Sequence, residues 1–225
     1  MAQGSKTAKI PFSVSVYEHA ARLIGLSPWE VSRDGALIFR AHREAYRLYR
    51  HFPVVAGIDI YNLEAEAYGC VVDKPGGNGI PAITQPLFAS LDEGFRVEPF
   101  DPRTAGRIPA VIEAGRRLAD EFPEADIRIP LSGPFSIATS LLGLNELLSG
   151  VAAAPEEVRL FLTRLVAGQA AFCRAVKEAG LDVAFFESAA APPLLSPSQF
   201  GEIALPPLKM VMRELAAELG HAVPC

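Results

Sequence analysis

Two acidic residues and one serine follow short apolar segments, at positions where parallel strands would present them to a common site. Asp59 ends the segment 53–60, and Glu187 with Ser188 follows the segment 181–186. A carboxylate at the end of so apolar a strand is partly desolvated, which raises its pKa and suits acid–base chemistry. We therefore predict Asp59, Glu187 and Ser188 as catalytic residues. The simpler interpretation, that they cap a helix and a loop, stays open.

Polar residues near these strand ends are candidates for binding a substrate. Asn62 and Glu66 are four residues apart, so on a helix both can face a pocket. Glu64 is two residues from Glu66 and cannot share its face, so we expect one of these two glutamates to be solvated. His19 is included because histidine titrates near neutrality, although a lone histidine is more often structural.

The segment after Gly133-Pro134 has the pattern of a helix start. Backbone N–H groups at such a start can bind an anion, so Phe135 and Ser136 are further candidates for substrate binding. By contrast, His42 and His51 lie in a charged helix and at its end, and we expect both at the surface.

The apolar spacing places these residues on alternating strands and helices. Helical spacing covers 14–25, 34–51, 102–122, 155–180 and 196–220, with Ser27-Pro28-Trp29-Glu30 as a capping box and Pro206-Pro207 as a break or kink. Strands are predicted near 53–59, 127–132, 181–187 and 221–225, and a short helix over 62–68 precedes a hairpin over 69–84. This alternation indicates parallel βα units, and polar strand ends favour a (β/α)8 barrel.

Four strands are half of the eight that a closed barrel needs. We therefore expect an α/β fold of the (β/α)8 TIM-barrel type, with an N-terminal helical arm over 1–52 and the first half of the barrel over 53–225. We also expect the chain to be truncated, since a half barrel exposes two sheet edges. Because no GxGxxG or GxxxxGK[ST] motif follows a strand, a nucleotide-binding doubly wound sheet has little support.

Composition and charge exclude several classes of partner. The 225 residues carry 21 Lys plus Arg against 26 Asp plus Glu, a net charge of −5, and without a basic stripe nucleic acid is excluded. No apolar run is as long as a membrane span, and the N-terminus lacks the apolar core of a signal peptide, so we expect a cytoplasmic protein. The three cysteines argue against a disulfide framework, and no metal site is complete within the chain.

Three short motifs follow one another along the chain. They are Gly57–Ile60 continued by Glu64–Cys70, then Leu131–Ala138, and last Phe186–Ala190 with Leu195–Phe200 and Pro206–Lys209. The series resembles the uroporphyrinogen decarboxylase family, in which a strand ending in an acid, a glycine-proline-aromatic turn and an acid-serine block occur in this order. The resemblance spans nearly the whole chain and implies a (β/α)8 barrel.

Departures from the decarboxylase pattern indicate another branch of that family. Decarboxylases bind the carboxylates of their substrate through arginines near the N-terminus, whereas residues 11–19 contain none. They also place a tyrosine where this chain has Ser140, which we keep as a substrate-binding candidate. The resemblance thus favours the corrinoid-dependent methyltransferases, which move a methyl group between a methylated corrinoid (cobalamin) protein and a thiol or a tetrahydrofolate-type acceptor.

That branch implies partners and a metal. The partners are the corrinoid protein and a small-molecule methyl acceptor, and we allow for a homo-oligomer. Thiol-specific members use zinc, which lowers the pKa of the thiol. Their His-x-Cys ligands would fall beyond Cys225, which is itself kept as a metal candidate. Uroporphyrinogen III decarboxylase activity in porphyrin (heme) biosynthesis is the alternative function, and a non-catalytic half-barrel module that pairs its strand edges is a second.

Overall fold

Three parallel strands form the centre of the molecule. The structure, a computed structural model, describes residues 14–223. Strands β1 (Val54–Val55), β2 (Ile127–Ser132) and β3 (Asp182–Phe186) lie in the order β1-β2-β3, with Val54 beside Ile127 and Ile129 beside Val183. Neighbours that follow chain order and run parallel are what successive units of a (β/α)8 barrel produce. The observed strand order agrees with the predicted barrel-type fold.

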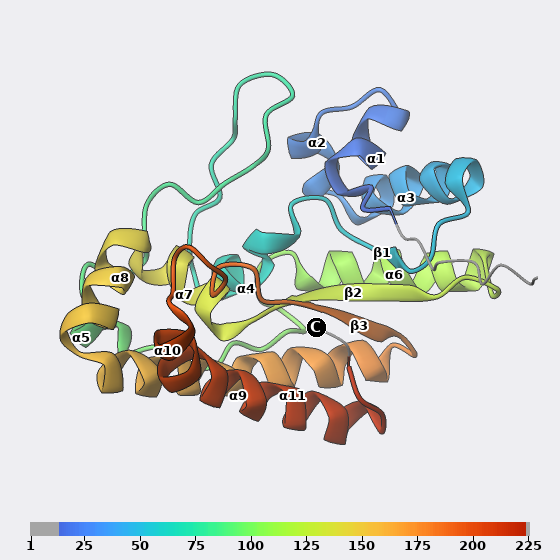
Figure 1. The fold of residues 1–225 in the computed structure, drawn as a ribbon. Coiled ribbons are helices and arrows are strands. Elements are labelled where there is room, and N and C mark those ends of the chain that lie inside the picture. Colours follow the sequence, from blue (N-terminus) through green and yellow to red (C-terminus); the bar gives the residue numbers. More distant parts are fainter. Residues whose placement is uncertain (1–13, 224–225) are drawn as a thin grey trace, which may run out of the picture.

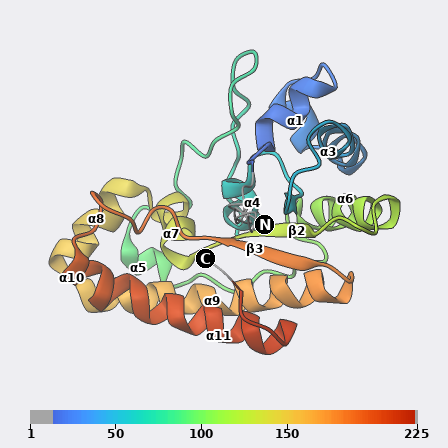
Figure 2. The ribbon, with the colours of Figure 1, turned by 45° about the vertical axis from the view of Figure 1, so that its right-hand side comes forward.

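Helices connect the strands and cover the sheet. Helix α6 (Ile108–Glu121) leads from β1 to β2, and α9 (Pro155–Glu178) leads from β2 to β3. Figures 1 and 2 both show α9 and α11 (Leu205–Leu219) side by side next to β3, and Figure 1 shows α6 running alongside β2. Both connecting helices are amphipathic, and Leu118 of α6 and Phe172 of α9 are fully buried.

An arm of three helices packs on α6. It consists of α1 (Tyr17–Leu23), α2 (Pro28–Ser32) and α3 (Gly35–Tyr49). The predicted capping box is confirmed, since Ser27 N donates to Glu30 Oε2 over 2.9 Å and Glu30 N donates to Ser27 Oγ over 3.3 Å. Helices α3 and α6 approach so closely that a Cβ at Gly35 would lie 2.9 Å from Ala110 O. The arm and the strands therefore share one apolar core.

Smaller elements complete the described chain. They are the 3-10 turn Ile60–Asn62, α4 (Leu63–Ala67), α5 (Leu91–Gly94), α7 (Pro134–Leu142), α8 (Leu144–Ala153), α10 (Pro197–Gln199) and a π-helical turn over Phe200–Ala204. Within residues 14–223 no single helix is long and apolar enough to cross a membrane, although α7 and α8 together reach that length and composition while meeting at 113°.

Three predicted elements differ in the structure. The strand expected over 53–59 covers only Val54 and Val55; Ala56 N still donates to Arg128 O, and the backbone then turns toward the 3-10 segment Ile60–Asn62, which Asp59 precedes. The expected hairpin over 69–84 is reduced to one antiparallel bridge, Asp73 with Ala82. Residues 221–223 form no strand, and the rest of the strand expected over 221–225 lies outside the described residues.

The chain stays helical from Pro197 to Leu219, and where a break or kink is predicted at Pro206-Pro207 the structure has a π-helical turn just before the prolines. The π-helical turn over 200–204 ends where α11 begins at Leu205, so both prolines occupy the first turn of α11. A proline costs no helical hydrogen bond at that position, since first-turn N–H groups have no partner within the helix.

The prediction that His42 and His51 lie at the surface is wrong. His42 is fully buried on the side of α3 that carries Ile38 and Ala45, and its Nε2 lies 2.8 Å from Gly57 O and 3.0 Å from Gly57 N. Burial lowers the pKa of His42 to about 4 and also lowers that of His51. His42 therefore links the arm to the backbone two residues before Asp59, in its neutral form.

Candidate functional site

The carboxyl ends of the three strands bring polar groups to one edge of the sheet. The segment after β1 ends at Asp59, β2 ends at Ser132, and Glu187 follows β3. Gly133 N donates to Phe186 O over 2.7 Å, which holds the segments after β2 and β3 together. We call this region, with Asp59, Ser132 and Glu187, the strand-end site. Its place agrees with the face on which barrel enzymes carry their active sites.

Asp59 is buried and fully engaged by an arginine. Its side chain is 1% exposed, and Arg107 reaches both carboxylate oxygens, with Nη1–Oδ1 at 2.5 Å and Nη2–Oδ2 at 2.8 Å. Asn62 Nδ2 donates to the same Oδ2 over 3.1 Å. A bidentate pair of this kind fixes the carboxylate strongly. In this structure Asp59 is an anchor for Arg107 and not a free proton acceptor.

Two further charges extend this pair into a buried network. Glu66 accepts from Arg107 Nε at 2.5 Å and from Arg33 Nη1 at 2.6 Å, and Arg33 stacks on the ring of Trp29. We call Arg33, Asp59, Glu66 and Arg107 the arginine–acid cluster. Its two positive and two negative charges balance, so each desolvated charge has a partner. The cluster joins the arm to the segment after β1 and to the start of α6.

The sequence predicts the acids of this cluster but neither arginine. Arg33 and Arg107 lie 33 and 41 residues from Glu66, so no local spacing indicates the contacts. Asn62 and Glu66 do meet the same cluster, Asn62 through Asp59. The expectation that Glu64 or Glu66 is solvated is wrong, because Glu64 is fully buried on the opposite side of α4 and only 15% of the Glu66 side chain is exposed.

Glu187 caps α7 from the neighbouring strand. Its Oε2 accepts from Phe135 N at 2.9 Å, and its Oε1 accepts from Ser136 N at 3.1 Å and from Ser136 Oγ at 2.6 Å. Burial raises the pKa of Glu187, and the hydrogen bonds from Ser136 and Phe135 oppose that rise. The pKa of Glu187 is thus raised, in the direction that the sequence predicts. The N–H groups of this helix start, predicted to bind substrate, are occupied in this structure by the side chain of Glu187, and substrate binding by Phe135 and Ser136 stays a prediction.

Glycine is required where Glu187 meets this turn. A Cβ at Gly133 would lie 2.2 Å from Glu187 Oε2. Phe135 takes part through its backbone only, since its ring is buried in the core, whereas Ser136 contributes both backbone and hydroxyl. Ser188 is exposed beside Glu187.

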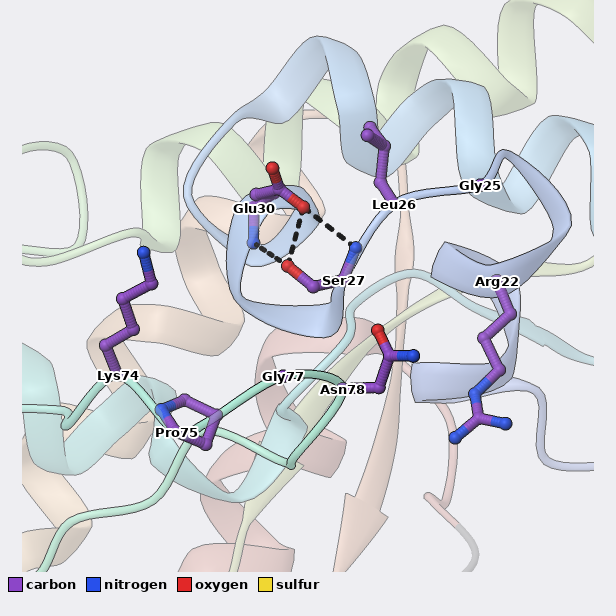
Figure 3. Close-up of a pocket in the computed structure, with 9 residues that line it drawn as sticks. All are labelled: Arg22, Gly25, Leu26, Ser27, Glu30, Lys74, Pro75, Gly77 and Asn78. Atoms are coloured by element: carbon purple, nitrogen blue, oxygen red, sulfur yellow. Dashed lines mark hydrogen bonds between the residues drawn. The ribbon is translucent and has the colours of Figure 1, made fainter.

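Two cavities lie near the site. The first, about 380 Å³, is bounded by Glu187 and by apolar residues that include Pro192, Leu195 and Phe200, and we call it the Phe200 groove. The second, about 570 Å³, lies between the arm and the loop over 74–78. Figure 3 shows the Ser27–Glu30 capping box on one wall of this second cavity, with Lys74 and Arg22 on opposite sides of it. Only the Phe200 groove reaches a residue of the strand-end site.

Comparison with known proteins places this architecture in a family. The family model described as uroporphyrinogen decarboxylase (URO-D) matches residues 1–225. The chain belongs to the URO-D family. The resemblance inferred from the three motifs is therefore confirmed, and with it the barrel-type fold.

The similar proteins found by sequence and by structure carry the names of methyltransferases. The chain is 28% identical over 137 residues to a methylcobamide:CoM methyltransferase MtaA of Methanosarcina barkeri, and 30% identical over 137 residues to that of M. barkeri strain Fusaro. Each match covers 60% of this chain and 40% of the relative. A solved methyltransferase from Methanosarcina mazei superposes with a TM-score of 0.78 at 21% identity, covering 94% of this chain and 61% of that one. The chain thus spans about two fifths of the length of these curated relatives.

Two of the predicted substrate-binding residues, Ser140 and His19, form no hydrogen bond with Asp59 or Glu187. Ser140 is in the second half of α7, where its carbonyl oxygen lies 3.7 Å from Cys70 Sγ. His19 is exposed on α1, and its Nε2 lies 2.7 Å from Tyr49 Oη. Tyr17, which the sequence indicates only as part of a helix, packs edge-on against Phe186 with ring centroids 6.3 Å apart. The arm therefore reaches the end of β3 through Tyr17.

The resemblance to thiol-specific methyltransferases predicts a zinc site, but the described part of this chain contains no set of ligands for it. Residues 14–223 contain no cluster of three His, Cys, Asp or Glu side chains that could hold a metal. Cys225 lies outside the described residues. Burial raises the pKa of Cys70 to about 11 and that of Cys173 to about 12, so both remain thiols at neutral pH. We therefore derive no chemical step through a metal from these residues.

Proposed function

We propose that the protein transfers a methyl group from a methylated corrinoid protein to a small-molecule acceptor, a thiol or a tetrahydrofolate-type compound. The observation that carries the proposal is the engagement of Asp59, the acid that the chain shares with the decarboxylases. Arg107 holds both of its oxygens, so this acid is not free to bind a tetrapyrrole. The named activity of the MtaA relatives supports the same branch.

The proposal also rests on how the arginines are used. A substrate with many carboxylates needs guanidinium groups that are free to bind it. Arg33 and Arg107, the arginines that reach Asp59, are instead neutralised by Asp59 and Glu66. A methyl acceptor with one reactive sulfur or nitrogen makes no such demand on the strand-end site.

Methyl transfer to a thiol requires a group that takes a proton. The carbon–cobalt bond breaks with its electron pair left on cobalt, the sulfur lone pair forms the new bond to carbon, and the thiol proton passes to a base. Glu187 suits that role because its carboxylate borders the Phe200 groove, burial raises its pKa, and the hydrogen bonds from Phe135 and Ser136 hold it in place. The apolar wall of the groove would exclude water from the reacting atoms.

The test uses the full-length gene product with free methylcobalamin and either 2-mercaptoethanesulfonate or tetrahydrofolate. We expect methylated acceptor by NMR and reduced cobalamin by absorbance, with Glu187→Gln slower by at least tenfold and Glu157→Gln, at an exposed carboxylate of α9, within a factor of about two. Decarboxylation of uroporphyrinogen III without any methyl transfer would establish the alternative function and overturn this one.

Partners follow from the proposed reaction. A corrinoid is too large for a cavity of about 380 Å³, so its carrier protein would dock over the strand ends and present only the methyl group. The family model is named for the decarboxylase and covers the whole chain, which is the observation that favours the alternative. A module without catalysis, pairing its strand edges with another copy, would show neither activity in the same assay.

A further inference from the structure

Two buried side chains hold the peptide groups of Ser132 from different elements. Ser132 N donates to Glu64 Oε1 of α4 over 2.6 Å, and Gln169 Nε2 of α9 donates to Ser132 O. Glu64 and Gln169 are both fully buried, and Ser132 is 3% exposed. The last residue of β2 is thereby held on its N–H side and on its C=O side by side chains 68 and 37 residues away.

Both side chains keep one polar atom without a partner. Among the described residues, Glu64 Oε2 and Gln169 Oε1 are buried and accept no hydrogen bond. An ionised carboxylate with no cation beside it is costly to bury even where neighbouring groups such as those of Ser132 donate to it, whereas the neutral acid is not. The geometry therefore favours a proton on Oε2, and the pKa of Glu64, which burial raises to about 7, agrees.

The surroundings of Glu64 supply no charge that would compensate its anion. Tyr68, on the same face one turn later, has its own pKa raised, chiefly by burial and also by Glu64. Helix α7 carries no titratable side chain, and in the turn before α4 only Tyr61 titrates. Arg107, which precedes α6, is taken by Asp59 and Glu66.

Ser132 begins the turn on which Glu187 is held. Gly133 N donates to Phe186 O, and Phe135 N and Ser136 N donate to the Glu187 carboxylate. A shift of the Ser132 peptide would move these donors, because only Gly133 and Pro134 separate them from it. The position of Glu187 thus depends on residues that do not touch it.

We propose that Glu64 is a protonated positioning residue, which together with Gln169 fixes the Ser132 peptide and so the turn that holds Glu187. The inference deepens the proposed function, since it concerns the residue assigned there as the base. Glu64 and Gln169 act through the backbone and do not touch the reacting atoms.

Protonation is tested by infrared difference spectroscopy on the full-length gene product. We expect a carboxylic acid C=O band at pH 6 that fades as the pH rises past about 7, and that is missing in Glu64→Gln. Glu157→Gln, at an exposed carboxylate of α9, is the matched control and should keep the band. A native spectrum that equals that of Glu64→Gln at pH 6 would overturn the protonation.

Positioning is tested by the amide NMR signals of Phe135 and Ser136, which report on Glu187 whether or not the protein transfers methyl groups. In Glu64→Met both signals should move toward their positions in Glu187→Gln, and in Glu64→Gln, which keeps an acceptor for Ser132 N, they should stay near the native positions. Unmoved signals in folded Glu64→Met and Gln169→Met would overturn the inference. If the native protein shows no methyl transfer while the signals move as expected, the proposed function fails and the positioning role stands.

The kinetic counterpart separates positioning from a general loss of structure. Glu64→Met should lower kcat for methyl transfer at least fivefold with KM changed less than twofold, and Glu64→Gln should restore kcat. Equal loss in both variants would contradict a role that depends on the Ser132 hydrogen bond.

Discussion

At the scale of single residues, the partner of each charge decides what that residue can do. Asp59 and Glu187 both end apolar segments, yet Asp59 is held by Arg107 while Glu187 is held by backbone N–H groups and a hydroxyl. The first arrangement neutralises the charge of a carboxylate that is itself only 1% exposed. The second leaves a carboxylate whose pKa is raised and which borders a cavity. Only Glu187 therefore combines burial with access.

Removing Arg107 should destabilise the fold strongly. Arg107→Met leaves Asp59 buried without its cation, and breaking a buried pair in this way costs about 3–5 kcal/mol. Urea unfolding followed by circular dichroism measures the loss. The control is Arg103→Met. Arg103 lies four residues before Arg107 and forms an exposed ion pair with Glu178, so its loss should cost less than about 1 kcal/mol. Equal losses of unfolding free energy in the two variants would show that the arginine–acid cluster stabilises the fold no more than an exposed ion pair does.

Glu64 should make the protein less stable as the pH rises. Its pKa is raised from 4.5 to about 7 in the folded state, so its contribution is fully present below pH 4.5 and is lost as the pH rises through about 7. A rise of this size corresponds to at most about 3 kcal/mol. His42 acts in the opposite direction, because its lowered pKa gives stability above pH 6.5 that is lost as the pH falls through about 4.

The measurement is the difference in unfolding free energy between the native protein and Glu64→Gln, followed from pH 5 to pH 8. The native protein should lose stability relative to Glu64→Gln across this range, since glutamine does not titrate. The difference in unfolding free energy between the native protein and Glu157→Gln, at an exposed carboxylate, should not change over the same pH range. A native protein that gains stability relative to Glu64→Gln would contradict the direction given by burial.

At the scale of elements, local patterns predict most helices and strands, and long-range contacts determine the site. The capping box at Ser27, β2, β3 and the long helix α9 follow from spacing within one segment, and all four are found where the sequence predicts them. Arg107 meets Asp59 across 48 residues and Ser132 meets Glu64 across 68, so periodicity carries no information about either contact. His42 shows the same limit, since its charged neighbours along α3 conceal that its own face is buried.

The turn between β2 and α7 should not tolerate a side chain at Gly133. In Gly133→Ala the new Cβ would lie 2.2 Å from Glu187 Oε2, so Glu187 must leave the start of α7. We expect a loss of roughly 1–3 kcal/mol, typical of forced overpacking, together with loss of methyl transfer. Thermal unfolding reports the loss of stability, the methyl-transfer assay reports the loss of activity, and the Phe135 amide signal reports the displacement of Glu187. Gly201→Ala, where the added Cβ meets open space within a helical turn, should leave the activity and the Phe135 amide signal unchanged and should not lower stability.

At the scale of the whole molecule, the three-stranded sheet has two edges. Among residues 14–223, β1 and β3 each pair only with β2, so each leaves one side of its backbone without a strand partner. The solved methyltransferase that superposes on this chain is longer, and the chain covers 61% of it. Unpaired strand edges are templates for pairing with another chain. Because such pairing uses backbone groups, it does not depend on the apolar side chains that are exposed elsewhere.

The 225-residue chain should therefore associate in solution. Sedimentation velocity across a hundredfold range of concentration should show species larger than 24.1 kDa that grow with concentration. Val71→Lys with Ile80→Lys removes two of the most exposed apolar side chains, both in the loop between α4 and α5, and should leave association unchanged because neither lies on a strand edge. A monomer at every concentration would show that the edges of β1 and β3 are covered in solution. Association abolished by the loop substitutions would instead identify the exposed apolar loop as the contact.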